Sequence, residues 1–259
     1  MISVLSVPFE PLLYEEALAK ARGFLEGRLQ HQIATPNPEF LVAATKNQKF
    51  QQVLQNASLN IPDGVGLLWA AAFLYGGART FSRFVKTYLY LIFAKKRLTG
   101  FLPERIAGSD FMIDLCRLGY PVFLLGGAEG VANEAKEVLK KRIPGVNIVG
   151  AYGGNPAKED LVALINQTTA QIVLVAFGAP KQDIWIANNL SQMPKVKIAM
   201  GVGGSLDFLV GRQVRAPKTM RKLGLEWLWR LVRQPSRWRR IWRAVAVFPF
   251  LIWINRKHA

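Results

Sequence analysis

Short apolar runs alternate with segments of helix length from residue 1 to about residue 210. The runs are rich in Val, Ile and Leu and end at Gly, Pro or Asn, which is typical of buried strands. This alternation predicts an α/β fold, with a Rossmann-like, mostly parallel sheet and helices on both of its faces. Strands are expected over residues 2–7, 31–34, 59–61, 121–127, 146–151, 172–177 and 196–200.

Two segments interrupt the alternation. Residues 77–104 are basic and aromatic, and they fit neither strand alternation nor clean helical periodicity. After Asp207 the alternation stops, and a tail rich in Trp and Arg begins. We therefore expect an α/β domain over residues 1–211, which carries an insertion at 77–104, and a helical, basic and aromatic appendage over residues 212–259.

Positive charge is concentrated in the same two segments. The chain carries a net charge of +17, of which residues 212–259 supply +12 and residues 79–102 supply +6, leaving −1 for the rest. The basicity therefore belongs to these segments and not to the α/β fold.

The tail combines this charge with five of the seven tryptophans. Cations beside amphipathic aromatic rings suit the surface of an anionic membrane. The apolar run at 244–254 is shorter than the ~20 residues that a spanning helix needs, so contact at the surface is expected. Two helices are expected, over about 219–233 and 236–247, with Pro235 between them. Lipid contact is expected from Arg230, Arg233, Arg237, Arg240, Trp238 and Trp242.

Two other interpretations of the tail were weighed. A solvated basic face over a core-packing apolar face accounts for Trp227 and Leu228, but it fits the dense apolar run at 248–254 poorly. Nucleic-acid binding also uses basic and aromatic clusters, yet the tail is too apolar and lacks a known DNA- or RNA-binding motif. We therefore expect no nucleic-acid partner and a peripheral location on the membrane. The lone Cys116 and the absence of signal-peptide features favour its cytoplasmic face.

Polar side chains follow several of the predicted strands. Thr35 and Asn37 stand in a proline-bounded turn, and Asp63 lies in a Pro-Asp-Gly loop. A carboxylate held there can take a proton from a hydroxyl group. The structural alternative for all three residues is a helix cap or a turn. Because the carboxyl ends of parallel strands gather ligands, both interpretations stay open at this point.

Two further loops carry groups suited to phosphate. Gly126 and Gly127 lie between a strand and a helix, where glycines let backbone N–H groups face a diphosphate. Their spacing differs from the dinucleotide fingerprint, so the signal is weak. Lys181 and Gln182 begin a helix that follows the strand expected over residues 172–177, and their side chains suit phosphate or sugar hydroxyls. A solvated helix start is the alternative for this pair.

The sequence offers little for metal or histidine chemistry. It has only two histidines, His31 and His258, and it contains neither an Asp-x-Asp pair nor a Walker-type motif. Cys116 stands among apolar residues and is expected in the core. No metal and no cofactor are therefore expected.

Seven motifs occur in a defined order along the chain. They are Thr35-Pro-Asn37, Pro62-Asp-Gly-Val-Gly66, Pro103-Glu-Arg-Ile-Ala-Gly-Ser-Asp110, Gly178-Ala-Pro-Lys-Gln182, Gly201-Val-Gly-Gly-Ser-Leu-Asp207, Arg215-Ala-Pro217 and Leu225-Glu-Trp-Leu-Trp-Arg230. In this order the chain resembles the WecG/TagA/CpsF family of bacterial glycosyltransferases over nearly its whole length. The resemblance implies transfer of an N-acetylmannosamine-type sugar, or of glucose, from a UDP-sugar to a membrane lipid-diphosphate-linked saccharide during synthesis of cell-surface polysaccharide.

The resemblance also implies roles for single residues. Asp63 would be the general base of an inverting transfer, and Arg105 would face the diphosphate. Thr35, Asn37 and Gln182 would hold the sugars, and Asp207 would help to hold the nucleotide. From their own positions in the sequence, Gly126, Gly127 and Lys181 are also expected to contact the nucleotide. One departure is large: 42 residues separate Asp63 from Arg105. The excess is the segment 77–104, which is therefore interpreted as an insertion that changes the acceptor or adds a membrane contact.

Two other function classes are kept as alternatives. A nucleotide-binding α/β oxidoreductase rests on the Gly126–Gly130 loop alone, and a non-catalytic membrane or nucleic-acid adaptor rests on charge alone. The sequence leaves the identity of the sugar, the acceptor lipid and the oligomeric state open.

Overall fold

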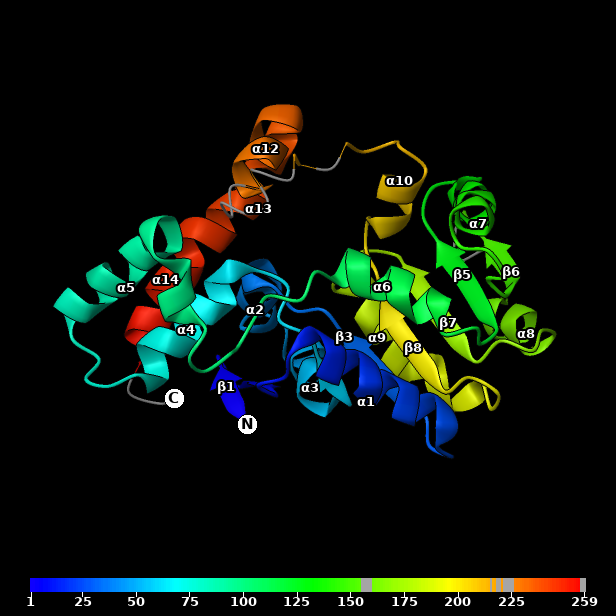
Figure 1. The fold of residues 1–259 in the computed structure, drawn as a ribbon, viewed down its shortest axis with the longest axis horizontal. Coiled ribbons are helices and arrows are strands. Elements are labelled where there is room, and N and C mark those ends of the chain that lie inside the picture. The colour runs from blue at the N-terminus through cyan, green and yellow to red at the C-terminus, as the bar shows by residue number, and fades with distance from the viewer. Residues whose placement is uncertain (155–159, 215, 218–219, 221–225, 257–259) are drawn as a thin grey trace.

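The computed structural model describes residues 1–154, 160–214, 216–217, 220 and 226–256. Within these residues, six strands form one parallel sheet in the order β4-β3-β8-β7-β5-β6 (Figure 1). The α/β class and the parallel sheet are thus confirmed. The strands are β3 (His31–Ala34), β4 (Leu59–Asn60), β5 (Val122–Gly126), β6 (Ile148–Tyr152), β7 (Ile172–Ala176) and β8 (Ile198–Gly201).

Helices cover both faces of this sheet, as predicted. Successive strand residues point to opposite faces, so Leu124 and Leu174 share one core while Phe123 and Val173 share another. The first core is closed by α1 (Tyr14–Glu26), α6 (Gly108–Arg117) and α7 (Val131–Arg142). The second is closed by α8 (Leu161–Asn166) and α9 (Lys181–Asn189), which continues into the 3-10 turn η2 (Leu190–Gln192).

The single strand expected over residues 2–7 is wrong. The structure has a separate antiparallel hairpin of β1 (Ile2–Val4) and β2 (Val7–Phe9). Its two turn residues, Leu5 and Ser6, have positive φ angles of 48° and 66°. Such a turn normally uses Asn or Gly, and neither residue is present to mark it in the sequence.

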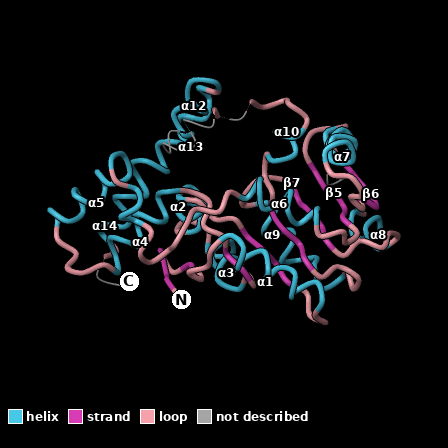
Figure 2. The backbone as a smooth tube through the Cα atoms, viewed as in Figure 1, coloured by secondary structure: helices cyan, strands magenta, loops and turns pink. Residues whose placement is uncertain are grey.

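A third core lies beyond the sheet and is built mainly from helices. It joins α2 (Pro38–Ala44), α3 (Gln48–Asn56), α4 (Val65–Tyr75), α5 (Phe81–Phe93) and α14 (Phe248–Ile254) with the hairpin. Figure 1 shows α4, α5 and α14 at the end of the molecule opposite β6, and Figure 2 shows helix and loop at that end. Helix α4 is apolar on all sides and almost entirely buried, as a central helix must be.

The segment 77–104 contains a regular helix, so the expectation of no helical periodicity is wrong for residues 81–93. Helix α5 begins at a Thr80 cap, whose Oγ1 accepts a hydrogen bond from the Arg83 backbone N–H at 3.3 Å. A short 3-10 helix, η1 (Lys95–Leu98), follows it. Arg79 and Arg83 donate to the carbonyls of Leu74 and Ala72 at the end of α4, which fixes the entry to α5.

The tail is helical, as expected, but it extends further than predicted. Helix α10 (Ser205–Leu209) precedes the tail. Within the described residues of the tail the order is α12 (Glu226–Arg233), η3 (Pro235–Arg237), α13 (Trp238–Trp242), the π-helical turn η4 (Arg243–Val247) and α14. The break at Pro235 is confirmed, whereas the predicted end near residue 247 is wrong. Residues 219 and 221–225 of the first predicted helix lie outside the described residues.

Helix α14 belongs to the third core. Phe248 and Ile252 are fully buried, and the Phe248 ring packs edge-on against Trp69 with centroids 6.3 Å apart. The expectation that 248–254 does not suit a buried face is therefore wrong for this side of the helix. Among the described helices, none has the length and apolar character required to cross a membrane.

Candidate active site

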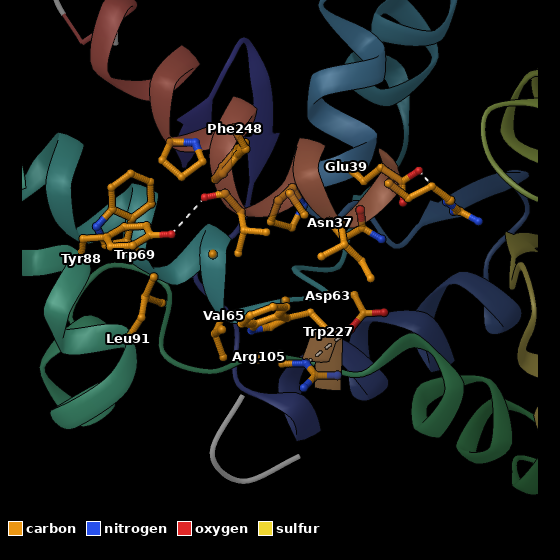
Figure 3. Close-up of a pocket in the computed structure, with 18 of the residues that line it drawn as sticks. Asn37, Glu39, Asp63, Val65, Trp69, Tyr88, Leu91, Arg105, Trp227 and Phe248 are labelled. Carbon is orange, nitrogen blue, oxygen red and sulfur yellow. Dashed lines mark hydrogen bonds and ion pairs between the residues drawn. The ribbon is translucent and has the colours of Figure 1, made fainter. Parts of the chain in front are cut away.

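A cavity of about 530 Å³ lies where α2, α4, α5 and the C-terminal helices meet. Its size is that of a pocket for a small ligand. One part of its wall is polar and contains Asn37, Asp63 and Arg105, whereas another part is apolar and contains Trp69 and Leu91 (Figure 3).

The polar wall comes from the carboxyl ends of two neighbouring strands. Asn37 follows β3 and Asp63 follows β4, and the Asp63 backbone N–H donates to the Pro36 carbonyl at 2.9 Å. Ile106 N–H donates to the Pro62 carbonyl at 3.1 Å, which brings the next loop alongside. The sheet edge therefore places three motifs that are distant in sequence beside one another.

Asp63 and Arg105 face each other across this wall. The Arg105 Nε lies 3.4 Å from Asp63 Oδ1, and the two side chains are 21% and 30% exposed (Figure 3). The pair thus combines a proton acceptor and a fixed cation on one cavity wall. The segment between them in the sequence therefore does not separate Arg105 from Asp63 in the fold, and the role of Arg105 toward a diphosphate stays a prediction.

Two glycines allow α4 to start beside Asp63. Gly64 has a φ of +145°, a backbone conformation that a side chain would strain. A Cβ on Gly66 would lie 2.8 Å from the Pro38 Cγ, so only glycine lets α4 approach α2 this closely. Asn37 caps α2 by accepting from the Phe40 N–H at 3.0 Å, which confirms the helix-cap interpretation, and it lines the cavity as well.

The apolar wall includes residues that the sequence did not single out. Tyr88 and Leu91 come from α5, so the segment interpreted as an insertion forms part of the cavity. Tyr88 OH donates to the Val245 carbonyl at 3.0 Å, which joins α5 to the tail, and burial raises the pKa of this phenol. Trp227 of α12 lines the cavity and is exposed, so its expected place in the core is wrong (Figure 3).

The residues expected to contact lipid occupy different environments. Arg237 and Arg240 line the cavity, and the Arg240 Nε lies 2.7 Å from Glu39 Oε1 on α2. Arg233 lies 4.8 Å from the Trp229 ring centroid and lines a separate cavity of about 160 Å³. Trp238 and Trp242 are exposed on α13. The side chain of Arg230 lies outside the described part of the chain.

Thr35 and Gln182 are buried close to the site but do not line the cavity. Thr35 Oγ1 lies 3.4 Å from the Gly201 carbonyl. Gln182 Oε1 accepts from the N–H groups of Gly178 and Gly203 at 3.1 and 2.9 Å, which ties the loops after β7 and β8 together. Both residues therefore shape the sheet edge, and their role in holding sugars stays a prediction.

The remaining candidates lie elsewhere along the sheet edge. Gly126 is the last residue of β5, three strands from β3, and Gly127 follows it. The Gly127 N–H donates to the Ala176 carbonyl at 3.1 Å. That donor is used within the protein, which weakens the loop as an anion site. Lys181 is exposed at the start of α9, and Asp207 lies in α10. Neither lines the cavity, so nucleotide binding by these four residues stays a prediction.

Three other reactive side chains, Cys116, His31 and Lys95, do not line the cavity. Burial raises the pKa of the Cys116 thiol to about 12, and His31 stacks on Phe24 with centroids 3.8 Å apart. Burial, together with the Arg105 charge, lowers the pKa of Lys95 in η1. Among the described residues, His, Cys, Asp and Glu form no cluster of three that is suited to a metal ion.

Comparison with known proteins assigns this site to a family. The sequence profile described as "Glycosyl transferase WecG/TagA/CpsF family" matches residues 2–90 and 89–259, two segments that meet within α5. The chain is also 31% identical over 214 residues to a protein of Bacillus spizizenii named N-acetylglucosaminyldiphosphoundecaprenol N-acetyl-beta-D-mannosaminyltransferase, covering 81% of this chain and 74% of that relative. The chain is therefore a glycosyltransferase and belongs to the WecG/TagA/CpsF family.

Proposed function

We propose that this enzyme moves a sugar from a UDP-sugar to a lipid-diphosphate-linked saccharide, with inversion at the anomeric carbon. The name of the Bacillus relative describes a mannosaminyl transfer to a lipid-diphosphate-linked N-acetylglucosamine, which supports a sugar of the N-acetylmannosamine type. The enzyme would work at the cytoplasmic face of the membrane, where such an acceptor is anchored. The described cavity wall offers three kinds of group for this reaction: a carboxylate, a guanidinium and apolar side chains.

One observation carries the proposal: Asp63 and Arg105 form a pair on the wall of a cavity that is otherwise largely apolar. An acceptor of this class has a sugar, a diphosphate and a long hydrocarbon chain. A cavity with a carboxylate and a guanidinium beside Trp69, Tyr88 and Leu91 matches these three parts in kind.

In the proposed reaction, the acceptor hydroxyl oxygen forms the new bond to the anomeric carbon of the donor sugar. Its proton passes to the Asp63 carboxylate. The bond from the anomeric carbon to the diphosphate oxygen breaks on the opposite face, and UDP leaves with the electron pair. Because attack and departure occur on opposite faces, the anomeric configuration inverts.

Negative charge grows on the leaving diphosphate, and protein groups would offset it. Arg105 supplies a guanidinium with a fixed hydrogen-bonding geometry. The N-terminus of α4, an eleven-residue helix that begins at Val65 beside Asp63, adds the positive end of its dipole. Catalysis without a metal ion is part of the proposal.

Replacement of Asp63 tests the assignment of the base. Asp63→Asn keeps the shape of the side chain but removes the proton acceptor, so transfer should fall by about 10²- to 10⁴-fold. UDP should raise the unfolding temperature of wild type and variant alike, whereas NAD should raise neither. Product formation from UDP-sugars and lipid-linked acceptors is the activity measurement.

Asp160→Asn is the matched control, because Asp160 caps α8 through the Ala163 N–H at 3.0 Å and Asn caps equally well. It should keep wild-type turnover. Wild-type turnover by Asp63→Asn would contradict the base assignment, and the lack of any UDP effect at saturation would contradict the UDP-sugar donor.

A further inference from the structure

Helix α5 carries a row of large apolar side chains on its outer side. Phe81, Val85, Leu89 and Phe93 are 66%, 40%, 47% and 79% exposed. They recur every fourth residue, so they form one continuous stripe along the helix. We call these four residues the α5 stripe. Contiguous exposure of this kind is rare on a soluble surface and marks a contact site.

The opposite side of α5 holds the helix firmly in place. Thr87 is buried and its Oγ1 accepts from Trp69 Nε1 at 3.1 Å, while Phe84 packs edge-on against Trp69 with centroids 5.3 Å apart. Tyr88 is bound to the tail through the Val245 carbonyl. The stripe is therefore presented by a fixed helix, and its exposure follows from the packing of the inner side.

The charge around the stripe identifies what it contacts. Residues 77–103 contain six Lys or Arg and no acid. Arg79 and Arg83 are used to cap α4, but Lys86, Lys96 and Arg97 have exposed side chains on α5 and η1. An apolar stripe flanked by exposed cations fits the boundary between anionic headgroups and acyl chains.

The tail is less suited to this role than its composition indicates. Phe248 and Ile252 are buried in the third core, and Arg240 is paired with Glu39. Each of α12, α13 and α14 exposes two large apolar side chains in the described structure, whereas α5 exposes four.

We propose that the α5 stripe inserts into the surface of an anionic lipid bilayer and is a principal membrane anchor of this enzyme. The inner side of the same helix lines the cavity with Tyr88 and Leu91. A helix with its side chains is about 10 Å thick, so docking through α5 brings the cavity close to the lipid surface. This proposed lipid contact goes beyond the proposed function, because binding of α5 to lipid requires no sugar transfer.

Flotation of the full-length protein with vesicles tests the proposal. Wild type should bind vesicles of phosphatidylcholine and phosphatidylglycerol. The double variant Phe81→Ser/Phe93→Ser should bind these vesicles at least about tenfold more weakly than wild type, because two exposed rings no longer enter the acyl region. Lys86→Gln/Lys96→Gln should weaken binding to the anionic vesicles and leave binding to phosphatidylcholine alone unchanged.

The matched control is Leu29→Ser, which removes an apolar side chain that is 71% exposed and lies between α1 and β3. It should bind vesicles like wild type. The unfolding temperature of each variant, with and without UDP, reports the fold and the transferase site separately, so loss of UDP protection cannot be confused with loss of lipid binding.

Two outcomes would overturn the proposal. One is wild-type flotation of the folded Phe81→Ser/Phe93→Ser variant. The other is that sedimentation velocity finds wild type as a dimer and the same variant as a monomer. The stripe would then contact a second copy of the chain and not lipid.

Discussion

Asp183 is the most unusual single residue in the described structure, because its carboxylate is fully buried. Neither carboxylate oxygen has a hydrogen-bond partner within the described part of the chain. Burial raises its pKa from 3.8 to about 7. The folded protein thus holds this proton more tightly than the unfolded chain does, and the free energy of unfolding falls as pH rises from about 4 to about 7.

Asp183→Asn should remove this pH dependence, since the amide is neutral throughout. The free energy of unfolding of the variant, relative to wild type, should rise by roughly 3–5 kcal/mol between pH 4 and pH 8. Urea denaturation at both pH values measures it, with the exposed Asp160→Asn as control. If the free energies of unfolding of variant and wild type differ by the same amount at both pH values, Asp183 ionises as readily in the folded protein as in the unfolded chain.

The sequence predicted which residues stand at strand ends, but it could not predict which of these ends are neighbours. Asn37 and Asp63 share the cavity because β3 and β4 pair, whereas Gly126 lies three strands from β3. Thr35 follows β3 and Gln182 lies in the first turn of α9, yet both side chains are buried and bonded to neighbouring loops, so neither lines the cavity. Strand order is a tertiary property, and no local pattern encodes it.

At the scale of elements, the contact between α2 and α13 closes one side of the cavity. It rests on the ion pair of Glu39 with Arg240, whose side chains are partly exposed. Arg240→Glu would place two carboxylates together and loosen this wall. We expect the KM for the lipid acceptor to rise about fivefold, since such a pair contributes up to about 1 kcal/mol. Steady-state kinetics with the lipid-linked acceptor measures it.

The charge-swapped double variant Glu39→Arg/Arg240→Glu should recover most of this loss, because it restores opposite charges. Arg239→Glu is the control, since Arg239 lies against Trp238 and not on the cavity wall. A KM that rises equally in Arg239→Glu would mean that general charge, and not this pair, governs acceptor binding.

Elements with one apolar face were predictable, and elements with two were not. Helix α7 has a buried side and a charged side, so its apolar residues recur with helical spacing. Helix α5 packs Phe84 inward while Phe81 and Phe93 are exposed, so apolar residues lie on both its inner and its outer side and obscure the helical period. The same ambiguity applies to residues 248–254, where Phe248 is buried and Phe250 is exposed.

At the scale of the whole molecule, the sheet and the helical core differ in how far the sequence specifies them. The sheet repeats one strand-and-helix unit, so its class follows from the pattern. The helical core joins α4 and α5 to α14, more than 150 residues later in the chain, through rings such as Trp69 and Phe248. No local pattern in the tail indicates that it packs against α4 and α5. For this reason the predicted domain boundary at residue 211 stays a prediction.

The place of α14 in this core leads to a final prediction about stability. Phe248 is 0% exposed and Phe250 is 60% exposed, although they lie two residues apart on one helix. Phe248→Ala should lower the free energy of unfolding by about 3–5 kcal/mol, because it leaves a cavity beside Trp69. Phe250→Ala should change it by less than about 0.5 kcal/mol. Denaturant unfolding without lipid measures both. Equal effects of the two substitutions on stability would mean that the tail is an appendage outside the core. The expected contrast would make α14 part of the third core, which also holds α5 in place and lines the cavity.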